Sequence, residues 1–329
     1  MTTLPVAEVL HSLEEELTAA RKRPSAEQGI NLVERVVDVL NSHQANLVVG
    51  DSRISKDQTL VVLQREAAAI SNQVPGITHI ASIDATSCVI VGFRTSQQTV
   101  ITHLDSPGSA STRCMQRMLD SCGEGDPVDV YLLGGCGSVK HAIPTLIEVL
   151  VFLNDHCGRM QLRLDGCCIW TMNVDPATKK CRYRGIAVNT MTGTPSPFEL
   201  LRSDRQKYPE GHLRTLAVFG EDREIRWITA TSEEAKKIRD VLKEEMEEEH
   251  SFCIRIGKFS WKPFPPHVVR FSREQIMDWS TTPELEPDDF PEVMKGALIY
   301  ANSYSVDDVF RTPAILYRYS PEGSCWCKL

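Results

Sequence analysis

The feature that most constrains the fold is a series of short β-branched runs, separated by turn residues, that begins near residue 45. Runs of this kind predict β-strands, and their close spacing predicts hairpins. The predicted strands cover residues 60–63, 77–83, 88–93, 99–102, 128–133, 162–172, 183–188, 213–219, 224–228, 253–256, 267–271 and 314–319. We therefore expect an α+β fold with a mostly antiparallel sheet core flanked by helices.

Helical patterns are confined to a few segments. Apolar residues recur at helical spacing from Val6 to Leu17, and Ser25 with Gln28 matches a capping box. These patterns predict a helical hairpin over residues 1–44, which serves as a packing appendage or an interaction arm, and a catalytic domain over residues 45–329. Further predicted helices cover residues 144–153, 232–250 and 290–301.

Composition excludes several classes of partner. The 329 residues include 36 Lys and Arg and 44 Asp and Glu, a net charge of −8. Binding along a phosphate backbone relies on clustered positive charge, so nucleic acid is not an expected partner. The longest apolar stretch, residues 143–153, is too short to cross a membrane.

The eleven cysteines cannot all pair within one chain, because their number is odd. The first seventeen residues carry four glutamates and lack the pattern of a signal peptide. We therefore expect reduced thiols and a cytoplasmic location, with the nucleus as an alternative. The Cys167–Cys168 and Cys325–Cys327 spacings do not suit zinc, and no metal or other cofactor is expected.

Motifs for several common chemistries are missing from the sequence. The glycines of residues 134–138 follow a predicted strand but lack the spacing of a phosphate-binding loop, and a tight turn accounts for them. The sequence also has no Gly-x-Ser-x-Gly elbow and no His-Glu-x-x-His helix. Thiol chemistry is the class that remains.

Cys88 and His103 are the candidate nucleophile and base. Cys88 opens one predicted strand, and His103 closes the next strand just before a turn. In an antiparallel hairpin around residues 94–97, positions whose numbers sum to 191 face each other, which puts Cys88 directly opposite His103. A slip of one residue would place the two side chains on opposite faces. A buried structural cysteine is the alternative.

The residues around this pair resemble those of the protein N-terminal asparagine amidohydrolase family. The blocks 84–88 (DATSC) and 101–105 (ITHLD) carry the resemblance, and residues 257–265 (GKFSWKPFP) are its most specific stretch. Further blocks agree in order: residues 64–66, 133–135, 185–189, 280–283, 286–287 and 315–317. The similarity spans residues 60–326, and it is poor over residues 114–127 and after residue 317.

This resemblance implies a cysteine amidohydrolase that converts an N-terminal asparagine to aspartate and ammonia. Such a reaction feeds the N-degron pathway, so proteins with N-terminal asparagine are the implied substrates. Arginyl-transfer and ubiquitin-ligase machinery are the implied indirect partners. The arrangement is also similar to that of bacterial receptor glutamine deamidases and cytotoxic necrotizing factor toxins, which implies their cysteine deamidase fold.

The implied mechanism assigns roles to four residues. His103 assists deprotonation of Cys88, whose sulfur attacks the carboxamide carbon to give a thioester, and we expect a lowered pKa for this thiol. Backbone N–H groups near Cys88, or the hydroxyl of Thr86 or Ser87, stabilise the oxyanion.

Selection of an N-terminal residue requires a group that senses the free α-ammonium. Glu66, Asp84 and Asp105 are the candidates, although Asp84 could simply cap its turn and Glu66 could pair with a cation. Arg65 is a candidate for orienting a carbonyl or the peptide backbone. Trp261 is a candidate wall of the pocket, with core packing as its alternative.

Two other functions stay open on the sequence. A non-catalytic adaptor would keep the fold and recognise N-termini without releasing ammonia. A protein-glutamine deamidase would act on a different side chain.

Overall fold

The computed structural model describes most of the chain. The described residues are 4–21, 25–42, 54, 58–74, 77–123, 125–136, 141–200, 214–215, 224–231, 253–261, 264–280, 282–286, 288–312, 314–320 and 325–328.

Ten strands form the larger sheet, in the order β1-β8-β7-β5-β6-β3-β11-β12-β13-β14. The pairs β7–β8 and β3–β11 are parallel, and the other pairs in this sheet are antiparallel. The strands are β1 (Leu4–Pro5), β3 (Glu66–Ser71), β5 (Val89–Arg94), β6 (Gln98–Leu104), β7 (Val128–Gly134), β8 (Leu162–Ile169), β11 (Arg226–Thr231), β12 (Cys253–Gly257), β13 (Ala314–Ser320) and β14 (Cys325–Lys328).

A second sheet has four strands in the order β10-β9-β4-β2. The pair β2–β4 is parallel, and the other two pairs are antiparallel. The strands are β2 (Thr59–Val62), β4 (His79–Ser82), β9 (Ile186–Asn189) and β10 (Pro195–Pro197). The α+β prediction is confirmed, and both sheets contain parallel as well as antiparallel pairs.

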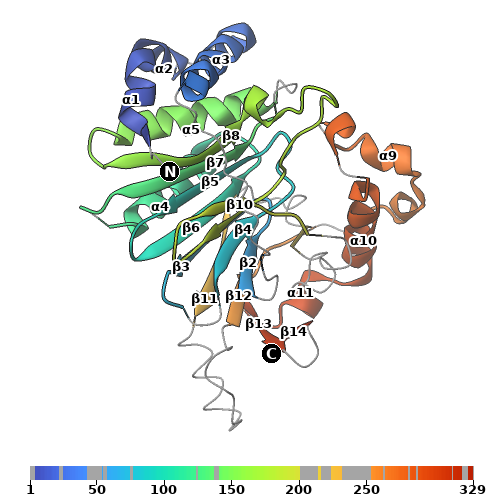
Figure 1. Cartoon of the computed structure of the whole chain (residues 1–329). Coiled ribbons are helices and arrows are strands. Elements are labelled where there is room, and N and C mark those ends of the chain that lie inside the picture. The colour runs from blue at the N-terminus through green and yellow to red at the C-terminus, as the bar shows by residue number, and fades with distance from the viewer. Residues whose placement is uncertain are drawn as a thin grey trace.

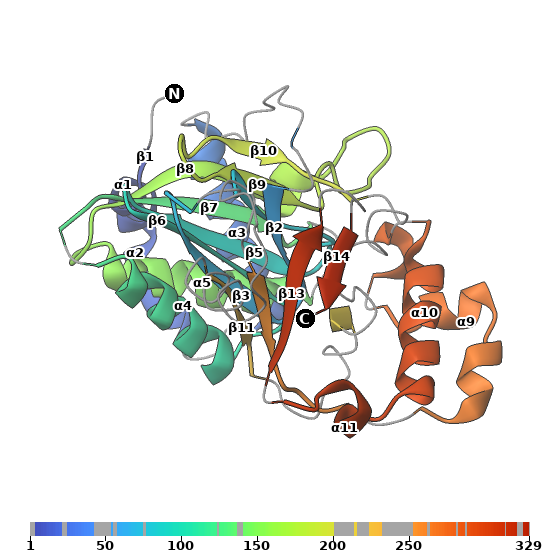
Figure 2. The ribbon, with the colours of Figure 1, turned by 90° about the horizontal axis from the view of Figure 1, so that it is seen from below.

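Helices and the smaller sheet cover opposite faces of the larger sheet (Figures 1 and 2). Helices α4 (Ser109–Ser121) and α5 (Ala142–His156) pack on β6 and β5, while β2 and β4 approach β6 from the other side. Every residue of β7 is buried, as expected for a strand covered on both faces. None of the helices in the described part of the chain is long and apolar enough to cross a membrane.

The N-terminal helices pack on the outside of α5 (Figure 1). They are α1 (Val6–Leu10), α2 (Glu14–Ala20) and α3 (Ala26–Ser42), with a short 3₁₀ turn η1 (His11–Leu13) between the first two. Their apolar faces belong to the same hydrophobic core as the sheet, and β1 pairs with β8 as the edge strand of the larger sheet. Helices are thus present over the described residues of the predicted N-terminal extension, whose separation from a domain of residues 45–329 stays a prediction, and the predicted boundary after residue 44 lies outside the described residues.

The remaining helical segments gather at one side of the sheets, where α9 and α10 lie next to each other (Figure 2). These segments are η6 (Pro266–Arg270), α9 (Arg273–Met277), η7 (Pro283–Leu285), α10 (Phe290–Ser303) and α11 (Val306–Val309). A further 3₁₀ turn, η3 (Trp170–Asn173), directly follows β8.

The β5–β6 hairpin is predicted correctly, but its register differs from the predicted one. Ile90 faces His103, so that facing positions sum to 193. Thr95 explains the shift, because its hydroxyl accepts hydrogen bonds from the backbone N–H groups of Gln97 and Gln98 and fixes the turn one residue later.

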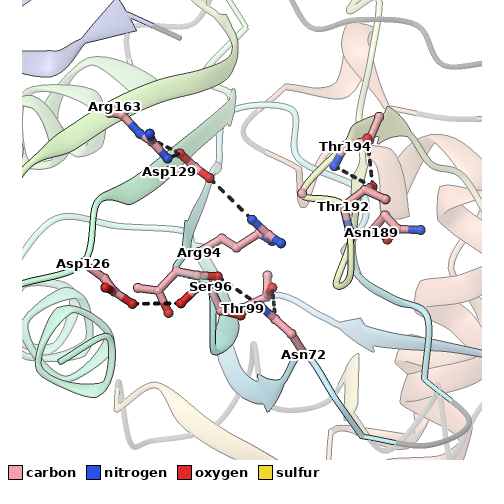
Figure 3. A network of polar contacts seen from close by, with 12 residues as sticks. Asn72, Arg94, Ser96, Thr99, Asp126, Asp129, Arg163, Asn189, Thr192 and Thr194 are labelled. Carbon is pink, nitrogen blue, oxygen red and sulfur yellow. Dashed lines mark hydrogen bonds and ion pairs between the residues drawn. The ribbon is translucent and has the colours of Figure 1, made fainter. Parts of the chain in front are cut away.

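Polar side chains fix this end of the hairpin against its neighbours (Figure 3). Arg94 of β5 forms an ion pair with Asp129 of β7 at 3.5 Å, and Asp129 also pairs with Arg163 of β8 at 2.6 Å. Asn72 accepts a hydrogen bond from Thr99 at 2.7 Å and donates to the turn carbonyls. Because β5 and β6 pair in one continuous ladder, fixing the turn end also fixes the register at the end that carries His103.

Three predicted elements differ from the structure. Residues 266–270 form the 3₁₀ turn η6 rather than a strand, because Pro266 occupies its first turn and suits helical geometry. The strand predicted over residues 162–172 ends at Ile169 and gives way to η3. In the hairpin predicted for residues 213–228, residues 214–215 are helical, and β11 pairs with β3 and β12 instead. The helix predicted over residues 232–250 lies outside the described residues.

Candidate active site

A backbone turn between the two sheets presents Cys88. The chain leaves the end of β4 and passes through Asp84, which has a positive φ of 66°. It enters β5 directly after Cys88. The N–H of Ala85 donates to the carbonyl of Arg184, and the N–H of Cys136 donates to the carbonyl of Thr86, both at 2.8 Å. Segments that are distant in the sequence thus hold the turn from two sides.

Close approach of β7 adds a third anchor. The N–H of Gly135 donates to the carbonyl of Cys88 at 2.8 Å. Gly134 has a φ of 110°, and a Cβ atom there would lie 2.2 Å from that same carbonyl oxygen. A residue with a side chain at position 134 would therefore displace the backbone of Cys88.

His103 lies near the end of β6 and is only 1% exposed. Its Nδ1 atom is 3.0 Å from the hydroxyl oxygen of Ser82, the last residue of β4. Its Nε2 atom is buried and has no hydrogen-bond partner among the described residues. When Nδ1 carries the proton, Nε2 presents a lone pair that can accept one.

Cys88 and His103 lie at the same end of the β5–β6 hairpin. Cys88 directly precedes Val89, the first residue of β5, and Val89 pairs with Leu104, the chain neighbour of His103. Because His103 itself pairs with Ile90, the predicted direct opposition of Cys88 and His103 is wrong by two residues. Cys88 lies outside the paired strand, so the shared face of the two side chains stays a prediction.

Burial sets the protonation states of this pair. It raises the pKa of the Cys88 thiol above its ordinary range, and the carboxylates of Asp105 and Glu286 act in the same direction. Burial also lowers the pKa of His103 to about 4, against the opposing effects of Asp84 and Asp105. The lowered thiol pKa expected from the sequence is wrong for this structure, because burial of the thiolate outweighs the opposing effects of Ser87 and Arg65 on the pKa.

Thr86 and Ser87 flank the sulfur on the N-terminal side. A hydrogen bond with Ser87 works to lower the pKa of the Cys88 thiol, although burial outweighs it. The hydroxyl of Thr86 lies 3.2 Å from the hydroxyl of Thr282, which precedes η7. The turn is thereby joined to the C-terminal part of the chain.

Arg65 and Asp105 form an ion pair next to the turn. The Nε atom of Arg65 donates to Asp105 at 2.5 Å, and both side chains are about 15% exposed or less. Arg65 adopts a positive φ of 59°, and its N–H donates to the carbonyl of His103. The charges of both residues influence the thiol of Cys88, which places the pair within electrostatic reach of the sulfur.

Glu66 is fully buried in a structural ion cluster. Its carboxylate accepts hydrogen bonds from Arg214 at 2.5 and 3.0 Å, from Arg226 at 2.9 Å and from the N–H of Leu63 at 2.8 Å. Burial alone would raise the pKa of Glu66, but the two arginines lower it below its ordinary value. The cation pairing that the sequence left open as the alternative is the arrangement in the structure.

Trp261 is 5% exposed and lies in an aromatic cluster. Its ring centroid is 5.6 Å from that of Phe259 and 6.3 Å from that of Phe310. The guanidinium of Arg226 lies over the ring of Phe259 at 4.1 Å, which connects this cluster to the Glu66 ion cluster. This is the core-packing arrangement named above as the alternative for Trp261.

Sequence reasoning did not single out three groups at this site. Ser82 gave no signal beyond its position at a strand end. Thr282 and Glu286 belong to a block that carries the family resemblance, but no chemistry was assigned to them. Their contacts connect residues almost two hundred positions apart, as for Thr86 and Thr282, and such contacts are invisible in local patterns.

Comparison with known proteins identifies the family of the chain. The family model described as protein N-terminal asparagine amidohydrolase matches residues 49–328, which include every site residue described above. The chain belongs to this family. The mouse (Mus musculus) protein N-terminal asparagine amidohydrolase is 26% identical over 328 residues, covering 92% of this chain and 96% of the relative. The human (Homo sapiens) protein of the same name is 26% identical over 327 residues, covering 91% and 96%.

The N-terminal helices lie outside the part of the chain that matches the protein N-terminal asparagine amidohydrolase family model. The model match begins at residue 49 and leaves out α1, α2 and α3. The alignments with the mouse and human relatives nevertheless cover about nine-tenths of the chain. At 26% identity, the roles of individual residues have to be argued from this chain's own geometry.

Proposed function

We propose that this amidohydrolase hydrolyses the side-chain amide of an N-terminal asparagine, producing aspartate and ammonia. The observation that carries the proposal is that Cys88 and His103 are both buried at the same end of the β5–β6 hairpin, and that Nε2 of His103 has no hydrogen-bond partner among the described residues. The names of the mouse and human relatives support the same reaction.

In the first step, the sulfur of Cys88 attacks the carboxamide carbon while Nε2 of His103 accepts the thiol proton. Both groups are neutral beforehand, because burial raises the thiol pKa and lowers the imidazole pKa. Proton transfer therefore accompanies formation of the sulfur–carbon bond, and no resting thiolate is needed. The carbonyl oxygen becomes an oxyanion.

In the second step, the carbon–nitrogen bond breaks and His103 returns the proton to the departing nitrogen, which leaves as ammonia. A thioester remains on Cys88. His103 then removes a proton from water, whose oxygen attacks the thioester and releases the carboxyl group of aspartate. The sulfur recovers the proton, so that one water is consumed for each ammonia released.

The oxyanion is stabilised at the Cys88 turn. Backbone N–H groups beside Cys88 and the hydroxyls of Thr86 and Ser87 are the donors we assign to this role. Loss of one such donor in comparable sites costs roughly 3 kcal/mol of transition-state stabilisation. Ser82 holds the imidazole of His103 through Nδ1, and so orients Nε2 for the proton transfers.

Substrate contacts come from charged residues around the turn. Asp84 is a carboxylate within electrostatic reach of His103, and we assign it to the substrate's N-terminal end. The Arg65–Asp105 pair offers donors for the peptide backbone on the other side. Glu66 has its carboxylate engaged by two arginines, so we assign it to maintaining the fold.

The proposed product places the chain in the N-degron pathway. Aspartate at an N-terminus is a substrate for arginyl transfer, after which ubiquitin ligases act, so these are its indirect partners. A nucleophilic thiol requires a reducing compartment, which favours the cytoplasm or the nucleus.

Ammonia release from peptides that differ only in their first residue tests the proposal. We expect release from the Asn-initiated peptide, none from Gln-initiated or internal-Gln peptides, and none from the Cys88→Ala variant with any peptide. Release from the glutamine peptides alone would identify a protein-glutamine deamidase. Peptide binding without ammonia release would identify an adaptor, and full activity of Cys88→Ala would refute the mechanism.

A further inference from the structure

Ser280, Thr282 and Glu286 form a polar bracket beside the Cys88 turn. The hydroxyl of Thr282 lies 3.2 Å from that of Thr86 and donates to Oε1 of Glu286 at 3.3 Å. The hydroxyl of Ser280 donates to the same Oε1 atom at 2.5 Å. Leu285 is buried against Cys136, whose N–H donates to the carbonyl of Thr86. Two independent contacts therefore fix the bracket to the turn that presents Cys88.

The hydrogen bonds that the Glu286 carboxylate accepts from described residues all end on one of its two oxygens. Within the described part of the chain, both hydrogen bonds that its carboxylate accepts end on Oε1. The side chain is half-buried, and no described residue donates a hydrogen bond to Oε2. This oxygen can therefore accept a hydrogen bond from a bound molecule.

The charges around the bracket favour a cation. Burial raises the pKa of Glu286, and the negative charge of Asp84 raises it further, which shows that the two carboxylates lie within reach of each other. The same carboxylate influences the thiol of Cys88. Arg184 partly offsets this negative charge, although its Nη2 atom lies 3.7 Å from Glu199. A bound ammonium group would relieve the repulsion between the two carboxylates.

We propose that Glu286 binds the α-ammonium group of the substrate through Oε2 and so restricts the enzyme to free N-termini. This inference rests on the proposed function, because it concerns the same site. The sequence candidates for this role were Glu66, Asp84 and Asp105, and Glu286 was not among them. Glu286 acts together with Asp84, while Ser280 and Thr282 hold its carboxylate in position.

The length of the asparagine side chain suits a fixed separation between Cys88 and Glu286. The α-nitrogen is three covalent bonds from the carbon that the sulfur attacks, whereas in glutamine it is four bonds away. A carboxylate that binds the ammonium and is itself fixed to the Cys88 turn therefore selects substrates by this distance. The bracket accounts in this way for selection of asparagine over glutamine as well as for selection of a free amine.

The test compares an Asn-initiated peptide with its N-acetylated form, in the wild type and in Glu286→Gln. Glutamine keeps the acceptor for Ser280 and Thr282 but removes the charge. We expect kcat/KM for the free-amine peptide to fall by about 10- to 100-fold, mainly through KM, as for loss of one hydrogen bond to a charged group. The ratio of kcat/KM between the free and acetylated peptides should fall by a similar factor.

The matched control is Glu284→Gln, an exposed residue in the same segment, which should leave both peptides unaffected. The ratio is measured within each variant, so a loss of folded protein cancels. Where turnover of the acetylated peptide is too slow, affinities of the two peptides for the Cys88→Ala protein, with and without Glu286→Gln, give the same ratio.

The outcomes separate this inference from the proposed function. A wild type that releases no ammonia from the Asn-initiated peptide refutes the function and the inference together. An active wild type whose preference for the free amine is unchanged in Glu286→Gln refutes only the inference. A reduced preference in Glu286→Gln with an unchanged Glu284→Gln supports it.

Discussion

Replacing Gly134 by alanine is expected to damage both the fold and the reaction. Gly134 is the last residue of β7 and adopts a φ of 110°. An added Cβ would lie 2.2 Å from the carbonyl oxygen of Cys88 and 3.2 Å from the Cβ of Ala85. A carbonyl oxygen cannot rotate away as a flexible side chain can, so the Cys88 turn has to move.

Two contributions set the size of this effect. Strain from the backbone conformation costs about 1 to 3 kcal/mol for a residue other than glycine. Overpacking of a well-packed site costs about 1 to 3 kcal/mol more. The free energy of unfolding of Gly134→Ala should therefore decrease by roughly 2 to 6 kcal/mol, and kcat/KM should decrease even for the molecules that remain folded.

Two other glycines separate these contributions. Gly123 has a positive φ of 75° but no atom within 4 Å of an added Cβ, so Gly123→Ala should show the backbone strain alone. Gly158 has neither feature, and Gly158→Ala should change stability by less than about 1 kcal/mol. Urea unfolding gives the stabilities, and ammonia release gives kcat/KM. If Gly134→Ala were no worse than Gly123→Ala in either measurement, the argument from the Cys88 carbonyl would fail.

Two further predictions concern buried charge and pH. Glu66→Gln leaves Arg214, which is 1% exposed, and Arg226 without their anionic partner, so urea unfolding should show a loss of about 3 to 5 kcal/mol. Glu224→Gln, which breaks an exposed pair with Arg113, should cost less than about 1 kcal/mol, and equal losses would contradict a structural role for Glu66. The pKa of His103 is lowered to about 4 in the folded protein and is near 6.5 when unfolded, so the unfolded chain binds the proton more readily. Its contribution is fully present above pH 6.5 and is lost as pH falls through 4, by about 3 kcal/mol in all. Stability measured between pH 7 and pH 4 should fall less steeply in His103→Gln, and parallel curves for the two proteins would contradict the assignment.

The hairpin that carries Cys88 and His103 could be predicted from sequence, but its register could not. Alternating β-branched runs marked both strands and placed Cys88 and His103 at the same end of the hairpin. The register depended on hydrogen bonds that the hydroxyl of Thr95 accepts from the N–H groups of Gln97 and Gln98, and on the ion pair between Arg94 and Asp129. Such contacts involve partners that a local pattern does not reveal, so the facing positions were displaced by two residues.

Strand β3 shows why other parts of the sheet were missed. Its sequence EAAAIS contains a single β-branched residue and begins with a glutamate, which is atypical of a strand. Ala67 and Ala68 point to opposite faces of the strand and are nevertheless both fully buried, because helix α4 and strand β2 both contact β3. Glu66 is tolerated there because Arg214 and Arg226 arrive from much later in the chain. The candidate carboxylate at Glu66 was therefore visible in the sequence, but its partners were not.

The position of β11 has a consequence for synthesis of the chain on the ribosome. β3 pairs on one side with β6, which follows it closely, but on the other side with β11, whose residues lie 160 positions later, as in the pair Arg226 and Glu66. A nascent chain that stops before residue 226 leaves the outer edge of β3 without the hydrogen bonds of β11 and Glu66 without the side chain of Arg226, and one that stops before residue 214 lacks both arginines. Products truncated shortly before residue 226 are therefore prone to aggregate, even though they already contain Cys88, His103 and most of the hydrophobic core.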